Sequence, residues 1–261
     1  MENANNSHIT DIEKYRRIRR KPNRLRWALA VVFAVSCMFA GYFFALSPFF
    51  AVREIAIIGN KQVSSQKIIQ LSGIESGDNI FAVNSAVVEQ WLQIEPKIQS
   101  AEISRSLSGK LTITVAERKA VAFIAIDKAF VEIDAEGRIL SRYATLTDYA
   151  LPLITGLPPE INKQAMVGSF LQAQGLKEAL SIVRALPDSA ADIGEIDVID
   201  TQQIRLYTLN GVEVRIGDCA NIADKYLVAS GVINNHSQSG NLGKLKYIDV
   251  SSGQAVICYK R

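Results

Sequence analysis

The rhythm of hydrophobic and polar residues changes twice along the chain. Residues 27–46, "WALAVVFAVSCMFAGYFFAL", are almost wholly apolar and contain no charged side chain. Residues 53–117 then mix helical and strand-like periods, whereas the remainder reads mostly as short strands. Because about 20 apolar residues span a bilayer as a helix, residues 27–46 predict a transmembrane helix. The two later regions predict folded domains.

The segment after the apolar run predicts the order strand, helix, helix, strand, strand. The five elements are expected in "EIAIIGN" (54–60), "SSQKIIQLSG" (64–73), "NSAVVEQWLQIEP" (84–96), "KIQSAEISRSL" (97–107) and "KLTITVAE" (110–117). In the last of these, Leu111, Ile113 and Val115 alternate with polar or small residues, which is typical of a half-buried strand.

The two predicted helices carry start, stop and face signals. Ser64 or Ser65 is a candidate N-cap of the first helix, and Gly73 is a candidate stop. Two pairs of residues four apart predict the apolar face of the second helix: Val87 with Trp91, and Val88 with Leu92.

Beyond residue 118 the pattern predicts a mixed, mainly antiparallel β region with flanking helices. Strands are expected in "AVAFIAI" (120–126), "AFVEID" (129–134), "RIL" (138–140), "IRLYTLNGVEVRI" (204–216), "KYIDV" (246–250) and "AVICYK" (255–260), and helices within 169–188 and 221–235. Asn210-Gly211 suits the type I′ turn of a hairpin. The three prolines of "LPLITGLPP" (151–159) predict a rigid connector. The fold class is therefore α+β, with a single transmembrane helix.

Charge sharpens the prediction of topology. The chain has a formal net charge of +3, but residues 1–26 alone carry eight basic and three acidic side chains. Basic residues beside a transmembrane helix favour the cytoplasmic side, so this tail is expected in the cytoplasm. The residues assigned to this role are Arg16, Arg17, Arg19, Arg20, Lys21, Arg24 and Arg26. The tail either sets topology alone or also binds lipid headgroups. A nucleic-acid binder would spread basic charge over a folded domain, so nucleic acid is not an expected partner.

The apolar run is interpreted as a membrane anchor from Trp27 to Leu46. Two alternatives are a cleaved signal peptide and a lipoprotein attached at Cys37. A signal peptide has a shorter apolar core of about 7–15 residues, and a lipoprotein would turn polar after its cysteine. A single-pass protein with its bulk outside the cytoplasm is the interpretation that remains.

Enzyme chemistry has no visible basis in the sequence. The two histidines, His8 and His236, have no metal-ligand neighbours at useful spacing, and no nucleophile elbow or phosphate loop is present. "GIESGDNIF" (73–81) could be a phosphate or calcium loop, although a turn between helices explains it better. Cys219 and Cys258 could pair in an oxidising space or remain buried thiols. We expect no catalytic residue, no metal, no cofactor and no small-molecule substrate.

The last nine residues, "GQAVICYKR", raise a different possibility. Chain ends are usually polar and frayed unless the fold holds them, yet Val256, Ile257, Cys258 and Tyr259 form an apolar run. Such a strand could lie inside a sheet, or it could be an edge strand that accepts a strand from another chain. Alternation would place Val256 and Cys258 on one face and the other two on the opposite face.

Several blocks carry a resemblance to a known family. They are "FFAVREIAIIGNKQVSSQKIIQLSGIESGDNIF", "IEPKIQSAEISRSLSGKLTITVAERKAVAFI", "FVEIDAEGRIL" and "LPLITGL". The first block resembles a POTRA domain, and the succession of anchor, single POTRA domain, E-R-x-x-V-A joint and L-P-x-I-T-G resembles the bacterial cell-division family FtsQ, called DivIB in Gram-positive bacteria. The resemblance implies a tail (1–26), a transmembrane helix (27–46), a POTRA domain (50–118) and an FtsQ-type β domain (119–261).

The resemblance also implies a function. Family members are non-enzymatic scaffolds of the cytoplasmic (inner) membrane at the division septum. They hold the coiled-coil proteins FtsB (DivIC) and FtsL, contact other division proteins through the POTRA domain, and help to control septal peptidoglycan synthesis. The rival interpretation is a POTRA-containing envelope-assembly or protein-export factor, although this chain has no room for the β-barrel that follows in the outer-membrane examples.

The matching stretch of the family's partner site is "KYIDVSSGQAVICYKR" (246–261). By the resemblance, Tyr247 begins the penultimate strand and Val256, Ile257, Cys258 and Tyr259 form the last, which receives an FtsB-like segment as an added strand. Lys260, next in the chain, would meet acidic residues of the partner.

Overall fold

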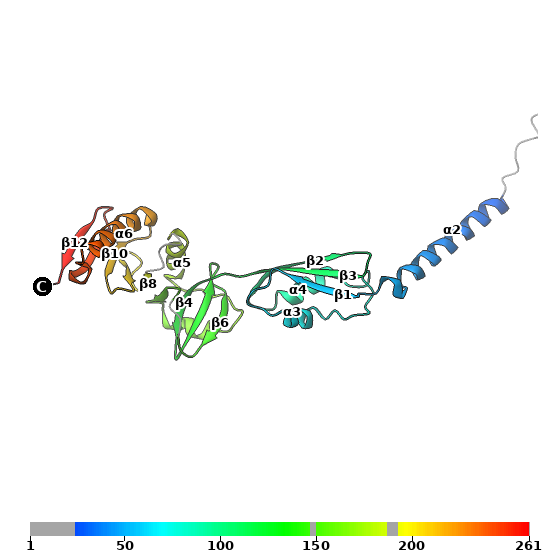
Figure 1. The fold of residues 1–261 in the computed structure, drawn as a ribbon, viewed down its shortest axis with the longest axis horizontal. Helices are drawn as coiled ribbons and strands as arrows, with labels where there is room; N and C mark the ends of the chain where they lie inside the picture. The colour runs from blue at the N-terminus through cyan, green and yellow to red at the C-terminus, as the bar shows by residue number, and fades with distance from the viewer. Residues whose placement is uncertain (1–23, 147–149, 187–192, 261) are drawn as a thin grey trace, which may run out of the picture.

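The computed structural model describes residues 24–146, 150–186 and 193–260. These residues form an elongated arrangement in which an N-terminal helix leads into a small domain, and the small domain leads into a larger β domain (Figure 1). Two separate hydrophobic cores support this division, one within residues 50–115 and one within residues 122–250.

Helix α2 (Arg24–Ala45) contains the predicted apolar run. Its 22 residues have a mean hydropathy of 2.1 over the best window, and none of that window is buried by the rest of the chain. At a rise of 1.5 Å per residue the helix is about 33 Å long, close to the 30 Å thickness of a bilayer core. It is the one helix of the described residues with this length and composition, and it fits membrane anchoring.

The small domain has the predicted order of elements. They are β1 (Glu54–Ile58), α3 (Ser65–Ser72), α4 (Ser85–Leu92), β2 (Ile98–Arg105) and β3 (Lys110–Glu117), preceded by the short helix η1 (Pro48–Phe50). The sheet order is β1-β3-β2, with β1 parallel and β2 antiparallel to β3. Leu111, Ile113 and Val115 of the central strand are buried, as their alternation predicts.

The predicted helix signals in this domain are largely confirmed. The Ser64 side chain accepts a hydrogen bond from the Lys67 N–H, and Gly73 ends α3 in the left-handed conformation at φ 64°. In α4, Val88 and Leu92 are buried, but Trp91 is 47% exposed. The four-residue apolar face was therefore predicted too broadly, because this short helix covers the sheet with only one of its two stripes.

The larger domain is built around a single sheet of nine strands. The strands are β4 (Ala120–Ile126), β5 (Ala129–Asp134), β6 (Ile139–Tyr143), β7 (Leu153–Thr155), β8 (Ile193–Asp197), β9 (Ile204–Thr208), β10 (Glu213–Gly217), β11 (Leu245–Asp249) and β12 (Val256–Tyr259). Their spatial order is β12-β11-β10-β9-β8-β7-β4-β5-β6. Five pairs are antiparallel and three are parallel, so the predicted mixed α+β class is confirmed.

The helices of this domain pack on one face of the sheet. They are α5 (Leu176–Ala185) and α6 (Ile222–Gln238), with the short helices η2 (Pro159–Gln164) and η3 (Leu242–Lys244). Ala229 of α6 lies in one core with Val214, Ile216 and Ile248 of the strands. Because side chains alternate between the faces of a strand, Glu213 and its neighbours at every second position lie on the opposite face.

The predicted connector at 151–159 is wrong in its central part. Residues Leu153–Thr155 form β7, which lies between β4 and β8 and is parallel to both. Ile154 is 1% exposed, as expected for a central strand. Pro152 lies immediately before the strand and Pro158 lies three residues after its end, so neither missing N–H removes a ladder bond.

Two adjacent charged residues hold the joint between the domains. The Glu117 carboxylate accepts hydrogen bonds of 2.9–3.0 Å from the backbone N–H groups of residues 61–63 in the small domain. Burial raises the pKa of Glu117, but these N–H groups and Lys97 outweigh it and lower the pKa. Arg118 contacts Asp134 of the larger domain at 2.7 Å, and Asp134 is 2% exposed. Glu117 therefore contacts the small domain and Arg118 contacts the larger one, both at the end of β3.

Candidate partner-binding edge

The C-terminal strand β12 lies at one end of the nine-stranded sheet (Figure 1). It pairs antiparallel with β11, and among the described residues no other strand pairs with its outer side. The backbone N–H and C=O groups on that side are therefore available to another strand. The prediction left open whether this strand lies inside the sheet or at its edge, and the structure places it at the edge.

The two faces of β12 differ in what they contact. Ile257 packs against the core, and Tyr259, two residues on, contacts α6 from the same face. Val256 lies on the opposite face and is 61% exposed, whereas Cys258 there is half-buried. The strand thus offers an open backbone flanked by an apolar side chain on each face.

Tyr259 is held in place by α6. Its hydroxyl lies 3.1 Å from Nε2 of His236, and the two ring centroids are 6.0 Å apart. Nδ1 of His236 lies 2.9 Å from the Val232 carbonyl, which can only accept, so Nδ1 donates there and Nε2 faces the tyrosine hydroxyl. The aromatic side chain is 51% exposed yet has a fixed orientation.

A charged track, formed by Glu213 and Arg215 of β10 with Tyr247 of β11, lies on the sheet face opposite α6. The Arg215 guanidinium lies 3.7 Å from the centre of the Tyr247 ring and 2.8 Å from a Glu213 carboxylate oxygen. The hydrogen bond from Arg215 to Glu213 raises the pKa of the arginine. Tyr247 is the middle residue of β11 rather than its first, and it pairs with Cys258.

The turn between β11 and β12 is closed by Asp249. Its carboxylate accepts hydrogen bonds from the Ser251 N–H at 3.0 Å and the Ser251 hydroxyl at 2.6 Å. Burial raises the pKa of Asp249, but these bonds and the charge of Arg215 outweigh it and lower the pKa. The Gly253 N–H donates to the Val250 carbonyl, and the glycine has φ 83°. This turn fixes the register in which β12 returns along the sheet.

The opposite edge of the same sheet is covered at its start. Ile139 of β6 donates its N–H to the Ser169 carbonyl and accepts from the Gly168 N–H, at 2.9 and 2.8 Å. The Leu171 N–H donates to the Gly137 carbonyl, and a bridge joins Arg138 to Phe170. The segment 168–171 therefore covers the start of β6 at Ile139, while the last residues of that strand, Arg142 and Tyr143, are exposed.

The remaining predicted residues fall in three places. The Lys260 N–H donates to the Lys244 carbonyl, which places this residue beside β11 just after the last strand. Trp27 is 73% exposed near the start of α2, and Leu46 follows its end. Arg24 and Arg26 lie in the first turn of α2. The other basic residues of the predicted topology signal, Arg16, Arg17, Arg19, Arg20 and Lys21, lie outside the described residues.

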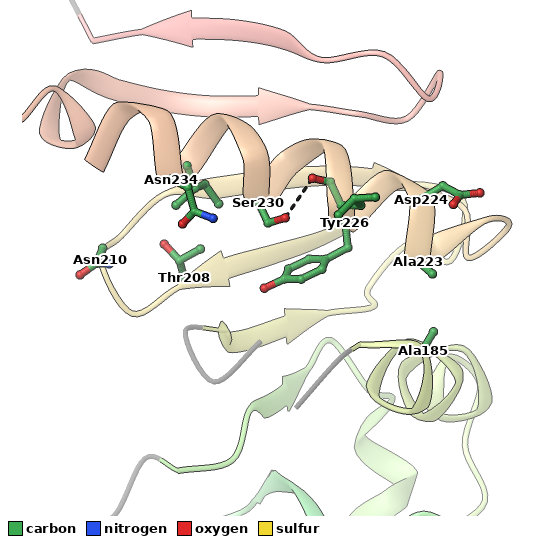
Figure 2. A pocket seen from close by; sticks show the side chains of 10 residues that line it. Ala185, Thr208, Asn210, Ala223, Asp224, Tyr226, Ser230 and Asn234 are labelled. Atoms are coloured by element: carbon green, nitrogen blue, oxygen red, sulfur yellow. Dashed lines mark hydrogen bonds between the residues drawn. The ribbon is translucent and has the colours of Figure 1, made fainter. Parts of the chain in front are cut away.

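A pocket of about 610 Å³ lies beside α6, facing the β9–β10 hairpin and the end of α5 (Figure 2). Its lining is mixed, with the exposed Leu227 beside the Ser230 hydroxyl, which donates to the Leu227 carbonyl.

The described residues contain no cluster of three metal-ligating side chains. In the loop 73–81, which the sequence allows as a phosphate or calcium loop, the Asp78 carboxylate accepts a hydrogen bond from the Glu75 N–H. Cys219 and Cys258 are free thiols in this structure.

Comparison with known proteins matches both domains. The model of the FtsQ-type POTRA domain matches residues 50–118, and the model of the C-terminal region of cell division protein FtsQ/DivIB matches residues 122–251. A cell division protein FtsQ from Syntrophotalea carbinolica is 30% identical over 232 residues, which cover 78% of this chain and 80% of that protein. A cell division protein DivIB from Clostridium botulinum is 27% identical over 249 residues, or 93% and 94% of the two chains.

These findings first define a class: an apolar N-terminal helix followed by a POTRA domain and a β domain, as in bacterial division proteins. The chain belongs to the FtsQ/DivIB family of cell division proteins. The edge strand was predicted by the sequence resemblance, whereas the tyrosine–histidine contact and the charged track were missed. The contact of Tyr259 with His236 and that of Arg215 with Tyr247 have no local signal, since each joins residues more than 20 positions apart.

Proposed function

We propose that this protein is a non-enzymatic, single-pass scaffold of the division machinery. Its N-terminus lies in the cytoplasm, α2 crosses the cytoplasmic membrane, and the two domains lie outside at the division septum. Family membership supports the division role, and the length of α2 supports the membrane span. The basic side chains on the N-terminal side of α2 support the orientation.

The open edge of β12 is the observation that carries the proposal. An FtsB/DivIC-like protein, joined to an FtsL-like protein, adds one strand to β12 and so extends the sheet. Main-chain hydrogen bonds supply affinity, and the side chains of Val256 and Tyr259, one on each face, supply specificity. Lys260 meets acidic residues of the partner. The POTRA domain contacts other division proteins, and the assembly helps to control septal peptidoglycan synthesis.

The direct test removes only the last strand. The native gene is replaced by a version that ends at Gly253, and cell length is measured with the protein level checked by immunoblot. We expect long undivided filaments at normal protein level, because the partner then has no β12 strand with which to pair. The matched control ends at Lys260, retains β12 and should divide normally.

Normal cell length in the Gly253 version would refute the partner site. Depletion of the whole protein then separates two explanations. Filaments on depletion would retain the division role and move the partner site elsewhere in the chain, whereas normal division on depletion would refute the division role as well.

A further inference from the structure

The end of the POTRA domain nearest α2 carries a cluster of aromatic rings. Phe50 is buried and contacts the rings of Phe44, Phe49 and Phe81, with centroids 5.0–5.3 Å apart. Phe44 also stacks on Phe49 at 6.1 Å. The cluster joins the last turn of α2, the short helix η1 and the loop between α3 and α4. The helix and the domain therefore share one packed junction.

A hydrogen bond fixes this junction further. The Asn79 side-chain amide donates to the Ala45 carbonyl at 2.7 Å, and Ala45 is the last residue of α2. That carbonyl would otherwise lack a partner, because the last four carbonyls of a helix have no intrahelical donor. The POTRA domain is thus attached directly to the helix end, with no free linker between them.

Three large apolar side chains are exposed at this end. Phe49 is 59% exposed, Phe81 is 50% exposed and Leu107 is 68% exposed. Leu107 lies at the tip of the β2–β3 hairpin, and this tip is held beside the start of β1 because the Arg53 N–H donates to the Gly109 carbonyl at 2.8 Å. Figure 1 shows the β2–β3 turn at the end of the domain from which α2 departs.

We propose that Phe49, Phe81 and Leu107 insert into the outer interface of the bilayer that α2 spans. The end of the POTRA domain that carries them is then the end that faces the membrane. The inference rests on the proposed membrane span. A 22-residue helix just crosses the hydrocarbon core, so its pinned C-terminal end lies at the interface. Phe49 follows Ala45 by four residues, and Phe49 and Phe81 both pack against the ring of Phe50. Phe and Leu side chains are among those that interfacial segments bury at the boundary between headgroups and acyl chains.

The contact has a consequence for the partner site. Because the POTRA domain would be held against the membrane at its end and at the helix, it could not swing about α2. The elongated arrangement in Figure 1 then fixes how far the β12 edge stands from the membrane. The distance between the β12 edge and the membrane then helps to select a partner that is anchored in the same bilayer.

The test measures the depth of single spin labels in the full chain, reconstituted in phosphatidylcholine–phosphatidylglycerol vesicles. Labels are placed at Phe81→Cys and Leu107→Cys, and at Ile94→Cys as the control. Ile94 is 70% exposed, which matches Leu107, but it lies at the far end of the POTRA domain beside Gln93, whose carbonyl contacts the β domain. A fourth label at Phe39→Cys reports the span itself.

The native cysteines, Cys37, Cys219 and Cys258, are replaced by serine in all four proteins. The depth parameter compares accessibility to oxygen, which concentrates in lipid, with accessibility to a water-soluble nickel complex. We expect it to be positive at positions 39, 81 and 107 and negative at position 94. The Phe81 substitution removes a ring contact with Phe50, so the Leu107 label gives an independent reading.

The outcomes separate the two proposals. A positive value at 39 with water-like values at 81 and 107 would overturn the membrane contact and leave the span intact. Water-like values at all four positions would overturn both. Protection at 81 and 107 that arises only after addition of a partner ectodomain would also overturn the contact, because this end would then be a protein interface.

Discussion

The two edges of the nine-stranded sheet differ in whether another segment of the chain bonds to their outer side. At one edge, the segment 168–171 supplies backbone hydrogen bonds to the outer side of β6. At the other edge, β12 lies without a second neighbour among the described residues. An unprotected edge strand favours aggregation, so a chain that covers one edge and leaves the other open is consistent with a partner at the open edge.

The flanking side chains differ as well. Ile139 and Leu140 of β6 are both buried, whereas Val256 and Tyr259 of β12 are both more than half exposed. The first two residues of β6 therefore belong to the core, although Arg142 and Tyr143 at its end are exposed. The open edge has apolar side chains in water and a backbone ready to pair, which are the two components of strand addition.

Uncovering β6 should have the largest effect. Gly168→Pro removes the N–H that bonds Ile139, and proline cannot adopt the φ of 93° found at Gly168. We expect a loss of about 3 kcal/mol in the free energy of unfolding, with aggregation through the exposed edge. Urea unfolding and light scattering measure both.

Gly168→Ala is the matched variant, since it keeps the N–H while straining the same φ. It should lose less stability and should not aggregate. Equal aggregation of the two variants would show that the cover over β6 does not depend on this hydrogen bond.

A cation at the open edge should have the next largest effect. Tyr259→Lys places a charge where the partner strand is expected, beside Lys260, and should weaken binding of the partner ectodomain about tenfold or more. Titration calorimetry with the FtsB-like ectodomain gives the affinity. The matched substitution at the β6 edge is Tyr143→Lys, at a residue that is 39% exposed and bonded to Glu132. It should change affinity less than twofold, and equal losses in both variants would remove the distinction between the edges.

The orientation of Tyr259 should matter less than its presence. His236→Ala removes the hydrogen-bond partner at 3.1 Å but leaves the edge backbone open. We expect affinity to fall about two- to fivefold, which corresponds to the net value of one hydrogen bond. An affinity loss as large as that of Tyr259→Lys would instead show that His236 contacts the partner directly.

The smallest effect should come from the turn that positions β12. The pKa of Asp249 is below its ordinary value of 3.8 in the folded chain, so its stabilising effect is present above that value and is lost as pH falls through the lowered pKa. Asp249→Asn should cost about 0.5 kcal/mol at pH 7, since the side chain is partly exposed to solvent. The two proteins should converge in stability in strong acid. A constant difference across pH would show that ionisation of Asp249 does not stabilise the turn.

Local patterns predicted most elements well. The alternation of Leu111, Ile113 and Val115 predicted a strand, and the Asn210-Gly211 pair lies in the turn between β9 and β10. The N-cap at Ser64 and the glycine stop at Gly73 were also visible. These features depend on residues within a few positions of one another, so the sequence carries them directly.

Other elements were missed or misread. β7 is three residues long between prolines, and it is a strand because β4 and β8 both pair with it. β8 lacked a clear local signal and was not predicted. Trp91 was assigned to a buried face, but its ring lies at the end of α3 beside Gly73 and is 47% exposed. In each case, long-range pairing or packing overrode the local pattern.

The sequence by itself determined the anchor, the domain order, the family and the presence of an apolar strand at the C-terminus. The residues alone left open whether this strand lies at an edge, and the family resemblance implied that it does. Only the tertiary structure decided that His236 contacts its tyrosine and that residues 168–171 cover the start of the other edge. The physical reason is that a strand's own residues fix its pleat and its faces. Its neighbours depend on which distant segments fill the space on either side, and residue spacing along the chain does not record that.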